Sequence, residues 1–235
     1  EPGGRPRVSV QRVPGTKGAE GLHLSVVIAG TWRMASWSWD TAARLRWIEA
    51  CVALGVTSFD HADIYGGYSV ESLFGEALAA SPGLRERIQI ISKCGIKLVA
   101  PARPAHAVKS YDSSGAHITA SVETSLRALR TDRIDVLLLH RPDALMDPDA
   151  VAETFHALRS AGKVLHFGLS EPGVQTIRRA HAVLPLTVIQ NEYSMLWRGP
   201  EKEVIPTCEE LGIGFVPWSP LGVQFLTGWI DANTR

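Results

Sequence analysis

Short apolar runs alternate with segments of helical periodicity from about residue 26 onward, and this alternation restricts the fold more than any other feature. The apolar runs, which we expect to be strands, are residues 26–30, 56–60, 88–93, 134–140, 164–169, 186–190 and 213–217. Apolar residues recur every three or four positions between these runs, which predicts helices near 40–54, 70–78, 118–129, 148–161, 173–183 and 201–211. Repeated strand–helix units predict a parallel sheet covered by helices.

The same pattern favours a barrel over a nucleotide-binding sheet. A dinucleotide-binding sheet would carry Gly-x-Gly-x-x-Gly after its first strand, and none follows residues 26–30, a continuous apolar run expected to be buried on both faces. We predict a single domain over residues 1–235, an (α/β)8 TIM barrel that lacks its last βα unit, because about seven strands are readable. Residues 8–10 and 22–24 flank a turn-like stretch at 14–18 and predict an N-terminal β-hairpin.

Charge and cysteine content restrict the partners and the compartment. The 24 basic and 24 acidic residues give a formal net charge of zero, so no basic face indicates nucleic acid or anionic lipid. No apolar stretch approaches the roughly 18 residues that a membrane span needs, and no signal-peptide pattern opens the chain. Three widely separated cysteines indicate a reducing compartment, so we predict a cytoplasmic protein without a membrane or nucleic-acid partner.

Four polar residues lie at or just beyond the C-terminal ends of predicted strands, namely Asp60, Tyr65, Lys93 and His140. Because the same ends of parallel strands meet at one mouth of a barrel, we expect these side chains to converge. A lysine ammonium lowers the pKa of a nearby tyrosine, an aspartate keeps the lysine charged, and a histidine can orient a substrate oxygen. Such a group can protonate a carbonyl oxygen but cannot reduce its carbon, so a cofactor must supply the hydride.

The sequence around these residues resembles the aldo-keto reductase family. Phe59-Asp60-His61-Ala62-Asp63-Ile64-Tyr65-Gly66 is similar to the family signature Asp-x-Ala-x-x-Tyr-Gly. Further similar blocks follow in family order at residues 91–93, 135–142, 162–170, 190–194 and 217–221. The resemblance covers about residues 26 to 230 and implies an (α/β)8 barrel in which NADPH reduces an aldehyde or ketone to an alcohol.

The resemblance also implies a role for each matching residue. Tyr65 would be the general acid, Lys93 and Asp60 would tune it, and His140 would orient the small-molecule carbonyl substrate. The implied cofactor-binding residues are Thr31, Ser170, Gln190, Trp218, Ser219, Leu221 and Gly222.

Within this set the implied contacts differ. Ser170 and Gln190 would hold the nicotinamide carboxamide, and Trp218 would stack on the nicotinamide ring. Thr31 and residues 219–222 would approach the ribose and pyrophosphate.

The tryptophan loop after the first predicted strand is a candidate wall of the substrate pocket. Trp32 and Trp37 are its two named candidates. The long loop at 96–116 would also help to set the substrate, whose identity the sequence does not give.

The chain departs from the family pattern in two places. Glu171 follows Ser170 where the family usually has an Asn that contributes to the carboxamide clamp. A glutamate can accept a hydrogen bond from the carboxamide nitrogen but cannot donate as an amide does, so cofactor affinity or orientation is expected to differ. The basic residues that bind the 2′-phosphate of NADPH lie near the family's eighth strand, so the NADPH preference rests on the resemblance alone.

Other interpretations use the same residues. A cofactor-binding regulatory or sensor protein on the same barrel would share the tetrad but show little turnover, and an incomplete barrel would be non-functional. A metal centre is not predicted, because neither His61-x-Asp63 nor His140-x-x-Asp143 has the spacing of a hydrolase-type site. Reduction of a carbonyl compound remains the main hypothesis.

Overall fold

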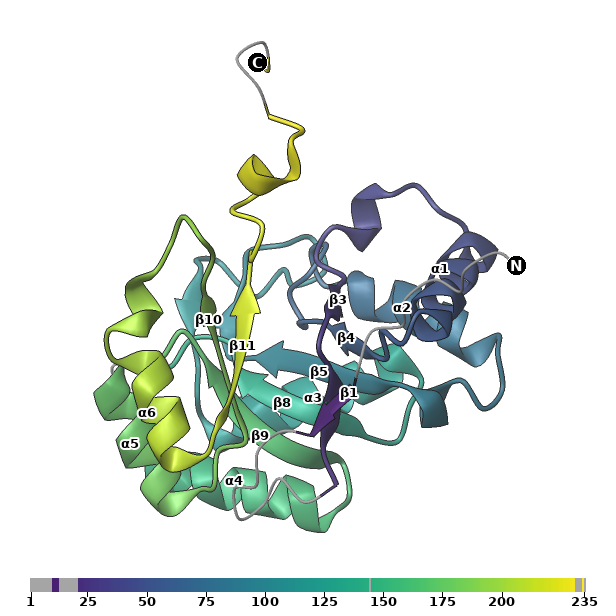
Figure 1. The fold of residues 1–235 in the computed structure, drawn as a ribbon. Helices are drawn as coiled ribbons and strands as arrows, with labels where there is room; N and C mark the ends of the chain where they lie inside the picture. Colours follow the sequence, from purple (N-terminus) through teal and green to yellow (C-terminus); the bar gives the residue numbers. More distant parts are fainter. Residues whose placement is uncertain (1–9, 13–20, 144, 231–233, 235) are drawn as a thin grey trace.

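A curled parallel sheet forms the centre of the molecule in the computed structural model, which describes residues 10–12, 21–143, 145–230 and 234 (Figure 1). Among these residues the strand order is β11-β10-β9-β8-β5-β4-β3. In chain order the strands are β3 (Ile28–Gly30), β4 (Ser58–Asp60), β5 (Gln89–Cys94), β8 (Ile134–Leu139), β9 (Val164–Ser170), β10 (Val188–Glu192) and β11 (Gly214–Trp218). The parallel α/β architecture and the seven readable strands agree with the prediction.

Helices cover the outer face of the curled sheet (Figure 1). They are α1 (Thr41–Ala53), α2 (Val70–Ala79), α3 (Gly115–Leu129), α4 (Pro148–Ser160), α5 (Val174–Val183) and α6 (Val204–Leu211), with 3-10 turns η1 (Met34–Ser36), η2 (Arg85–Arg87), η3 (Gly199–Glu201) and η4 (Phe225–Thr227). Asp147 caps α4 as predicted, since its carboxylate accepts from the Asp149 N–H at 3.0 Å. Within the described ranges, no helix combines the length and hydrophobicity needed to cross a bilayer.

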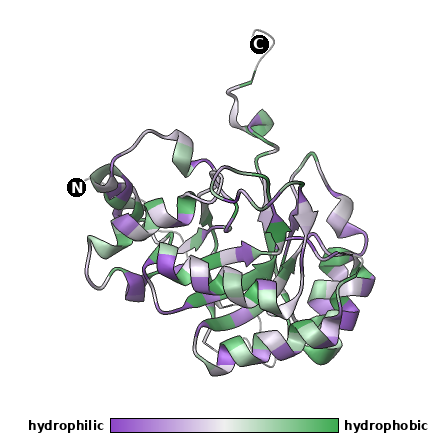
Figure 2. Cartoon of the chain, turned by 180° about the vertical axis from the view of Figure 1, so that it is seen from behind, coloured by the Kyte–Doolittle hydropathy of each residue, from purple (hydrophilic) through white to green (hydrophobic). Residues whose placement is uncertain are grey.

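Two apolar layers lie on opposite faces of the sheet. Successive strand residues point to opposite faces, so on β5 Ile90 packs under the helices while Ile91 packs inside the curl. The outer layer includes Phe155 of α4 stacked on Phe167 of β9, with ring centroids 4.2 Å apart. Figure 2 shows hydrophobic residues concentrated on the strands and hydrophilic residues spread along the helices.

Close helix packing explains one glycine in the outer layer. A Cβ on Gly75 of α2 would lie 2.1 Å from the carbonyl oxygen of Ala128 in α3. Any larger residue would therefore push these two helices apart.

The predicted N-terminal hairpin is present as an antiparallel pair, β1 (Val10–Arg12) and β2 (His23–Ser25). Leu22 and Leu24 enter the inner cluster beside Val136 and Val188. The hairpin thus supplies apolar side chains to the interior of the curl. The predicted first-strand residues 8–9 and the turn at 14–18 lie outside the described residues.

Two predictions about local structure were wrong. Val26 and Val27 were expected in a doubly buried strand, but they are 54% and 52% exposed and the strand begins at Ile28. The Ser25 hydroxyl donates to the Val27 carbonyl at 2.7 Å, and this local bond replaces the expected start of the ladder. The long loop expected at 96–116 contains a short antiparallel pair, β6 (Ile96–Lys97) and β7 (Ser110–Tyr111), and its last residues begin α3.

Candidate active site

Inward-facing positions at or near the ends of the parallel strands carry six of the predicted site residues. On β5, Lys93 lies two residues after the inward-facing Ile91, while the adjacent Cys94 packs in the outer cluster. The same two-residue alternation applies on the neighbouring strands. The residues at these ends are Asp60 (β4), Lys93 (β5), His140 (after β8), Ser170 (β9), Gln190 (β10) and Trp218 (β11).

Lys93 connects the carboxylate and the phenol of the predicted tetrad. Its Nζ donates to Asp60 Oδ1 at 2.8 Å and Oδ2 at 2.7 Å, and to the Tyr65 hydroxyl at 3.1 Å. The His61 carbonyl accepts from the same ammonium at 2.7 Å. Burial is the largest single effect and disfavours the charged ammonium, but Asp60 and Tyr65 together outweigh it, so the pKa of Lys93 is raised. Lys93 therefore remains a cation inside the curl.

Tyr65 is held by a tight turn after β4. The Tyr65 N–H donates to the Ala62 carbonyl at 3.1 Å, and Gly66 follows with φ of 59°. A Cβ on Gly66 would lie 2.8 Å from Ala35 Cβ, so the signature glycine lets the turn pass close to the loop after β3.

The pKa of Tyr65 differs from the sequence-based expectation. Lys93 lowers this pKa as expected, but burial of the phenol raises it by more, and Asp60 raises it further. The net pKa of Tyr65 is raised, because desolvation outweighs the ammonium in this buried position. With its pKa raised, the Tyr65 hydroxyl is protonated at neutral pH.

His140 lies beside Tyr65, with ring centroids 6.0 Å apart and planes at 76°. Burial, together with the positive charges of Lys93 and Arg141, lowers the pKa of His140 to about 2. The imidazole is therefore neutral, with one N–H to donate. Its Nδ1 is buried without a partner among the described residues, so this ring has hydrogen-bonding capacity to spare.

Both predicted carboxamide-binding residues contact the network around the tetrad. Gln190 Nε2 donates to Asp60 Oδ1 at 3.0 Å, and Ser170 Oγ accepts from Arg141 Nη1 at 3.2 Å. Arg141 also donates to the His140 carbonyl at 2.9 Å. Sequence reasoning missed Arg141, although its position directly after His140 was a usable signal.

Glu171 makes two contacts that the sequence did not predict. Its Oε1 accepts from the Trp218 indole N–H at 2.5 Å and from the Glu192 N–H at 2.6 Å. Sequence reasoning had weighed this carboxylate only as a partner for the cofactor carboxamide.

Thr31 is fully buried, and its hydroxyl donates to the Asp60 carbonyl at 2.8 Å and contacts His61 Nδ1 at 3.0 Å. The other predicted ribose and pyrophosphate residues follow β11, where Ser219 and Gly222 have positive φ and Leu221 is exposed. Cofactor contacts by these residues stay predictions.

The two tryptophans predicted to line the substrate pocket differ in their exposure to solvent. Trp32 is 61% exposed and lies under the Arg33 guanidinium. Trp37 packs against the outer cluster, with its ring centroid 5.1 Å from that of Trp47. A role in the substrate pocket stays a prediction for both residues.

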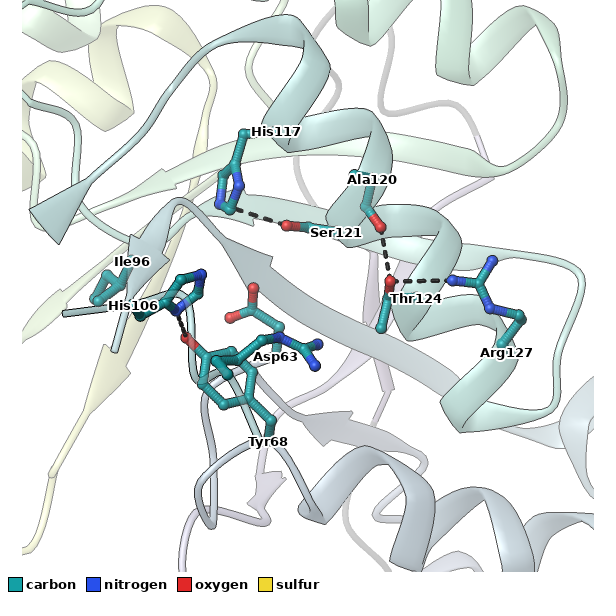
Figure 3. Close-up of a pocket in the computed structure, with 10 residues that line it drawn as sticks. Asp63, Tyr68, Ile96, His106, His117, Ala120, Ser121, Thr124 and Arg127 are labelled. Carbon is teal, nitrogen blue, oxygen red and sulfur yellow. Dashed lines mark hydrogen bonds between the residues drawn. The ribbon is translucent and has the colours of Figure 1, made fainter. Parts of the chain in front are cut away.

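A cavity of about 390 Å³ lies outside the tetrad, between the loop after β4, the 96–111 hairpin and helix α3 (Figure 3). Asp63 and Tyr68 line it, and the Tyr68 hydroxyl contacts His106 at 3.4 Å. Asp63 Oδ1 is buried without a partner among the described residues. Burial, with Glu71 adding negative charge, raises the pKa of Asp63 well above its usual range.

Replacing Asp63 with Asn is expected to raise the free energy of unfolding. The raised pKa means that the Asp63 carboxyl loses its proton less easily in the folded state than in the unfolded state. Asp63 therefore lowers the stability of the fold as the pH rises above the pKa that this carboxyl has in the unfolded chain. We expect a gain of about 1–3 kcal/mol at pH 8 that shrinks toward pH 5, measured by urea denaturation. The matched variant Asp132→Asn, at a largely exposed carboxylate, should change little at either pH. A gain from Asp63→Asn that does not vary with pH would contradict this explanation.

Comparison with known proteins relates this geometry to a family. The profile of the Aldo/keto reductase family matches residues 26–235, and the uncharacterized oxidoreductase YcsN of Bacillus subtilis is 50% identical over 92% of this chain and 74% of its own length. The chain belongs to the aldo/keto reductase family. The 6-dehydroglucose reductase of Agrobacterium fabrum is 37% identical over 86% of this chain and 69% of its own length. The solved glycerol dehydrogenase of Gluconobacter oxydans superposes with a TM-score of 0.83 at 29% identity, covering 96% of this chain and 68% of that one.

These similarities confirm the predicted family, its TIM-barrel type of fold and the oxidoreductase class. Aldo/keto reductases in general reduce small carbonyl compounds with a nicotinamide cofactor. Membership of the family therefore supports carbonyl reduction and a nicotinamide cofactor for this chain.

Proposed function

We propose that this aldo/keto reductase uses NADPH to reduce an aldehyde or ketone to an alcohol, with Tyr65 as the proton donor. One observation carries the proposal: the buried Lys93 ammonium contacts both the Asp60 carboxylate and the Tyr65 hydroxyl at the mouth of the curled sheet. A phenol beside a buried cation can release a proton when a stronger base forms next to it.

The proton transfer follows from the contacts in the tetrad. A carbonyl oxygen placed between Tyr65 and His140 can accept from the phenol and from the neutral imidazole. As negative charge grows on that oxygen, Tyr65 gives up its proton and the Lys93 ammonium stabilises the phenolate left behind. Asp60 keeps Lys93 charged and directed toward Tyr65.

The side chains around the tetrad fit a nicotinamide cofactor, which when bound supplies the hydride for the carbonyl carbon. Ser170 Oγ accepts from Arg141, which leaves its O–H free to donate. Gln190 uses one of its two N–H groups on Asp60 and keeps its carbonyl as an acceptor. A carboxamide needs both a donor and an acceptor, and Trp218 offers an aromatic face on the adjacent strand end.

Titration of the whole chain with NADPH and with NADH, followed by fluorescence, tests the cofactor. NADPH consumption in the presence of simple and hydroxylated aldehydes and ketones tests the reaction. The hydroxylated compounds are included because two similar proteins are named as a 6-dehydroglucose reductase and a glycerol dehydrogenase. Tighter binding of NADPH than NADH, with turnover of at least one carbonyl, is the expected result. Binding without turnover would favour the regulatory alternative, and no binding of either dinucleotide would contradict both functions.

His140 is expected to remain neutral across the working pH range. Its pKa of about 2 predicts no change in the ring carbon resonances of His140 between pH 5 and 8 in NMR spectra. The signal is assigned by its loss in His140→Asn. The rate of carbonyl reduction should likewise show no step from this residue over that range. A midpoint near the value of a free histidine would contradict the neutral donor role.

A further inference from the structure

Glu171 occupies an unusual backbone position between two elements of the site. It directly follows β9 with φ of 57°, in the left-handed region that few residues other than glycine adopt. Its N–H donates to the Gln190 carbonyl at 2.8 Å, which extends the ladder to β10 by one bond. The strained conformation directs the carboxylate across the ends of the neighbouring strands.

The carboxylate links three consecutive strand ends through one oxygen. Glu171 Oε1, just after β9, accepts from the Glu192 N–H at the end of β10 and from the Trp218 indole at the end of β11. Glu192 and Trp218 are paired residues in the parallel register of β10 and β11. Because β11 pairs only with β10 among the described strands, this contact adds a side-chain restraint at the open edge.

An indole has only one hydrogen-bonding group, its Nε1–H, so a single acceptor fixes the rotation of the ring. The acceptor here is a carboxyl oxygen of Glu171, which lies 2.5 Å from the indole nitrogen. Trp218 is half-buried and therefore has room to rotate if the contact is lost. The orientation of this ring thus depends on Glu171.

We propose that Glu171 is a positioning residue that fixes the Trp218 ring as the stacking platform for the nicotinamide. This inference rests on the proposed function, because it requires the cofactor to bind against Trp218. It also gives a different role to Glu171, which stands where the family usually has an Asn. Glu171 Oε1 already accepts two hydrogen bonds, so in this proposal the residue acts on the cofactor through Trp218.

The test uses the whole chain and compares Glu171→Ala, Glu171→Gln and Trp218→Phe. Glu171→Ala removes the acceptor, Glu171→Gln keeps an acceptor oxygen of the same reach, and Trp218→Phe keeps a ring but removes the donor. Glu201→Ala is the matched control, since the Glu201 carboxylate also accepts from two side chains nearby but does not contact Trp218. The readouts are NADPH affinity, kcat at saturating NADPH, and the Trp218 indole N–H resonance in the cofactor-free protein.

Glu171→Ala should weaken NADPH binding about tenfold and shift the indole resonance, while kcat at saturation changes less than about threefold. Glu171→Gln and Glu201→Ala should bind within about twofold of the unmodified chain, and Glu171→Ala should have little further effect when combined with Trp218→Phe. An equal loss from Glu171→Ala in both backgrounds, or no loss, would overturn the positioning role alone. Failure of the unmodified chain to bind NADPH would instead contradict the proposed function, and the positioning role with it.

Discussion

Replacing Tyr65 with Phe is expected to lower kcat for carbonyl reduction by about a thousandfold, within the range that general acid catalysis contributes. The substitution removes only the hydroxyl that contacts Lys93 at 3.1 Å and keeps the ring beside His140. Affinity for NADPH should stay within about twofold, since the hydroxyl is needed only when the carbonyl oxygen gains charge. Stopped-flow or steady-state NADPH consumption measures kcat, and fluorescence titration measures the affinity.

Tyr68 provides a matched control three residues further along the chain. Its hydroxyl accepts from the Leu98 N–H at 2.8 Å and contacts His106, outside the tetrad. Tyr68→Phe should therefore leave kcat within about threefold, although it removes the same atom from a tyrosine of the same loop. If Tyr65→Phe kept turnover comparable to that of Tyr68→Phe, Tyr65 could not be the proton donor.

Replacing Lys93 with Met is expected to abolish measurable turnover and to lower the free energy of unfolding by about 3–5 kcal/mol. Lys93 is 1% exposed, and its removal leaves the Asp60 carboxylate with only the Gln190 amide among its described side-chain partners. A buried charge without its counter-ion is costly, because water no longer solvates it. Denaturant unfolding followed by circular dichroism gives the stability change.

A second variant separates charge pairing from catalysis. Combining Lys93→Met with Asp60→Asn removes both charges and should restore most of the lost stability, while turnover stays absent. Lys97→Met is the matched control, because Lys97 pairs with Asp112 at 3.5 Å in a partly exposed position and should cost no more than about 1 kcal/mol. Equal losses from Lys93→Met and Lys97→Met would contradict the importance of the buried pair.

The convergence of the tetrad could be predicted from sequence because it depends on local rules. Alternation along β5 places Lys93 inside and Cys94 outside, and the parallel order brings Asp60 and His140 to the same end. The direction of the pKa shift of Tyr65 could not be predicted. It depends on whether burial of the phenol, which raises the pKa, outweighs the Lys93 ammonium, which lowers it.

Two specific side-chain contacts between distant segments could not be predicted either. Gln190 reaches Asp60 across 130 positions, and Glu171 reaches Trp218 across 47. The choice of partner depends on the curvature of the sheet and on side-chain rotamers, which no motif spacing encodes. Val26 and Val27 were misplaced for a related reason, since hydrophobicity alone does not show where a strand's ladder begins.

The Gln190 amide joins two parts of the site that sequence reasoning treated separately. One of its N–H groups contacts Asp60, the carboxylate that holds Lys93. If the other groups of this amide bind the carboxamide, a shift of Gln190 on cofactor binding weakens or strengthens its hydrogen bond to Asp60, and through Asp60 and Lys93 it alters the proton affinity of Tyr65. Linkage then requires the reverse effect of equal size: deprotonation of Tyr65 changes the affinity for the cofactor by the same factor. In such a site a pH titration of cofactor affinity would report on the proton donor without any substrate present.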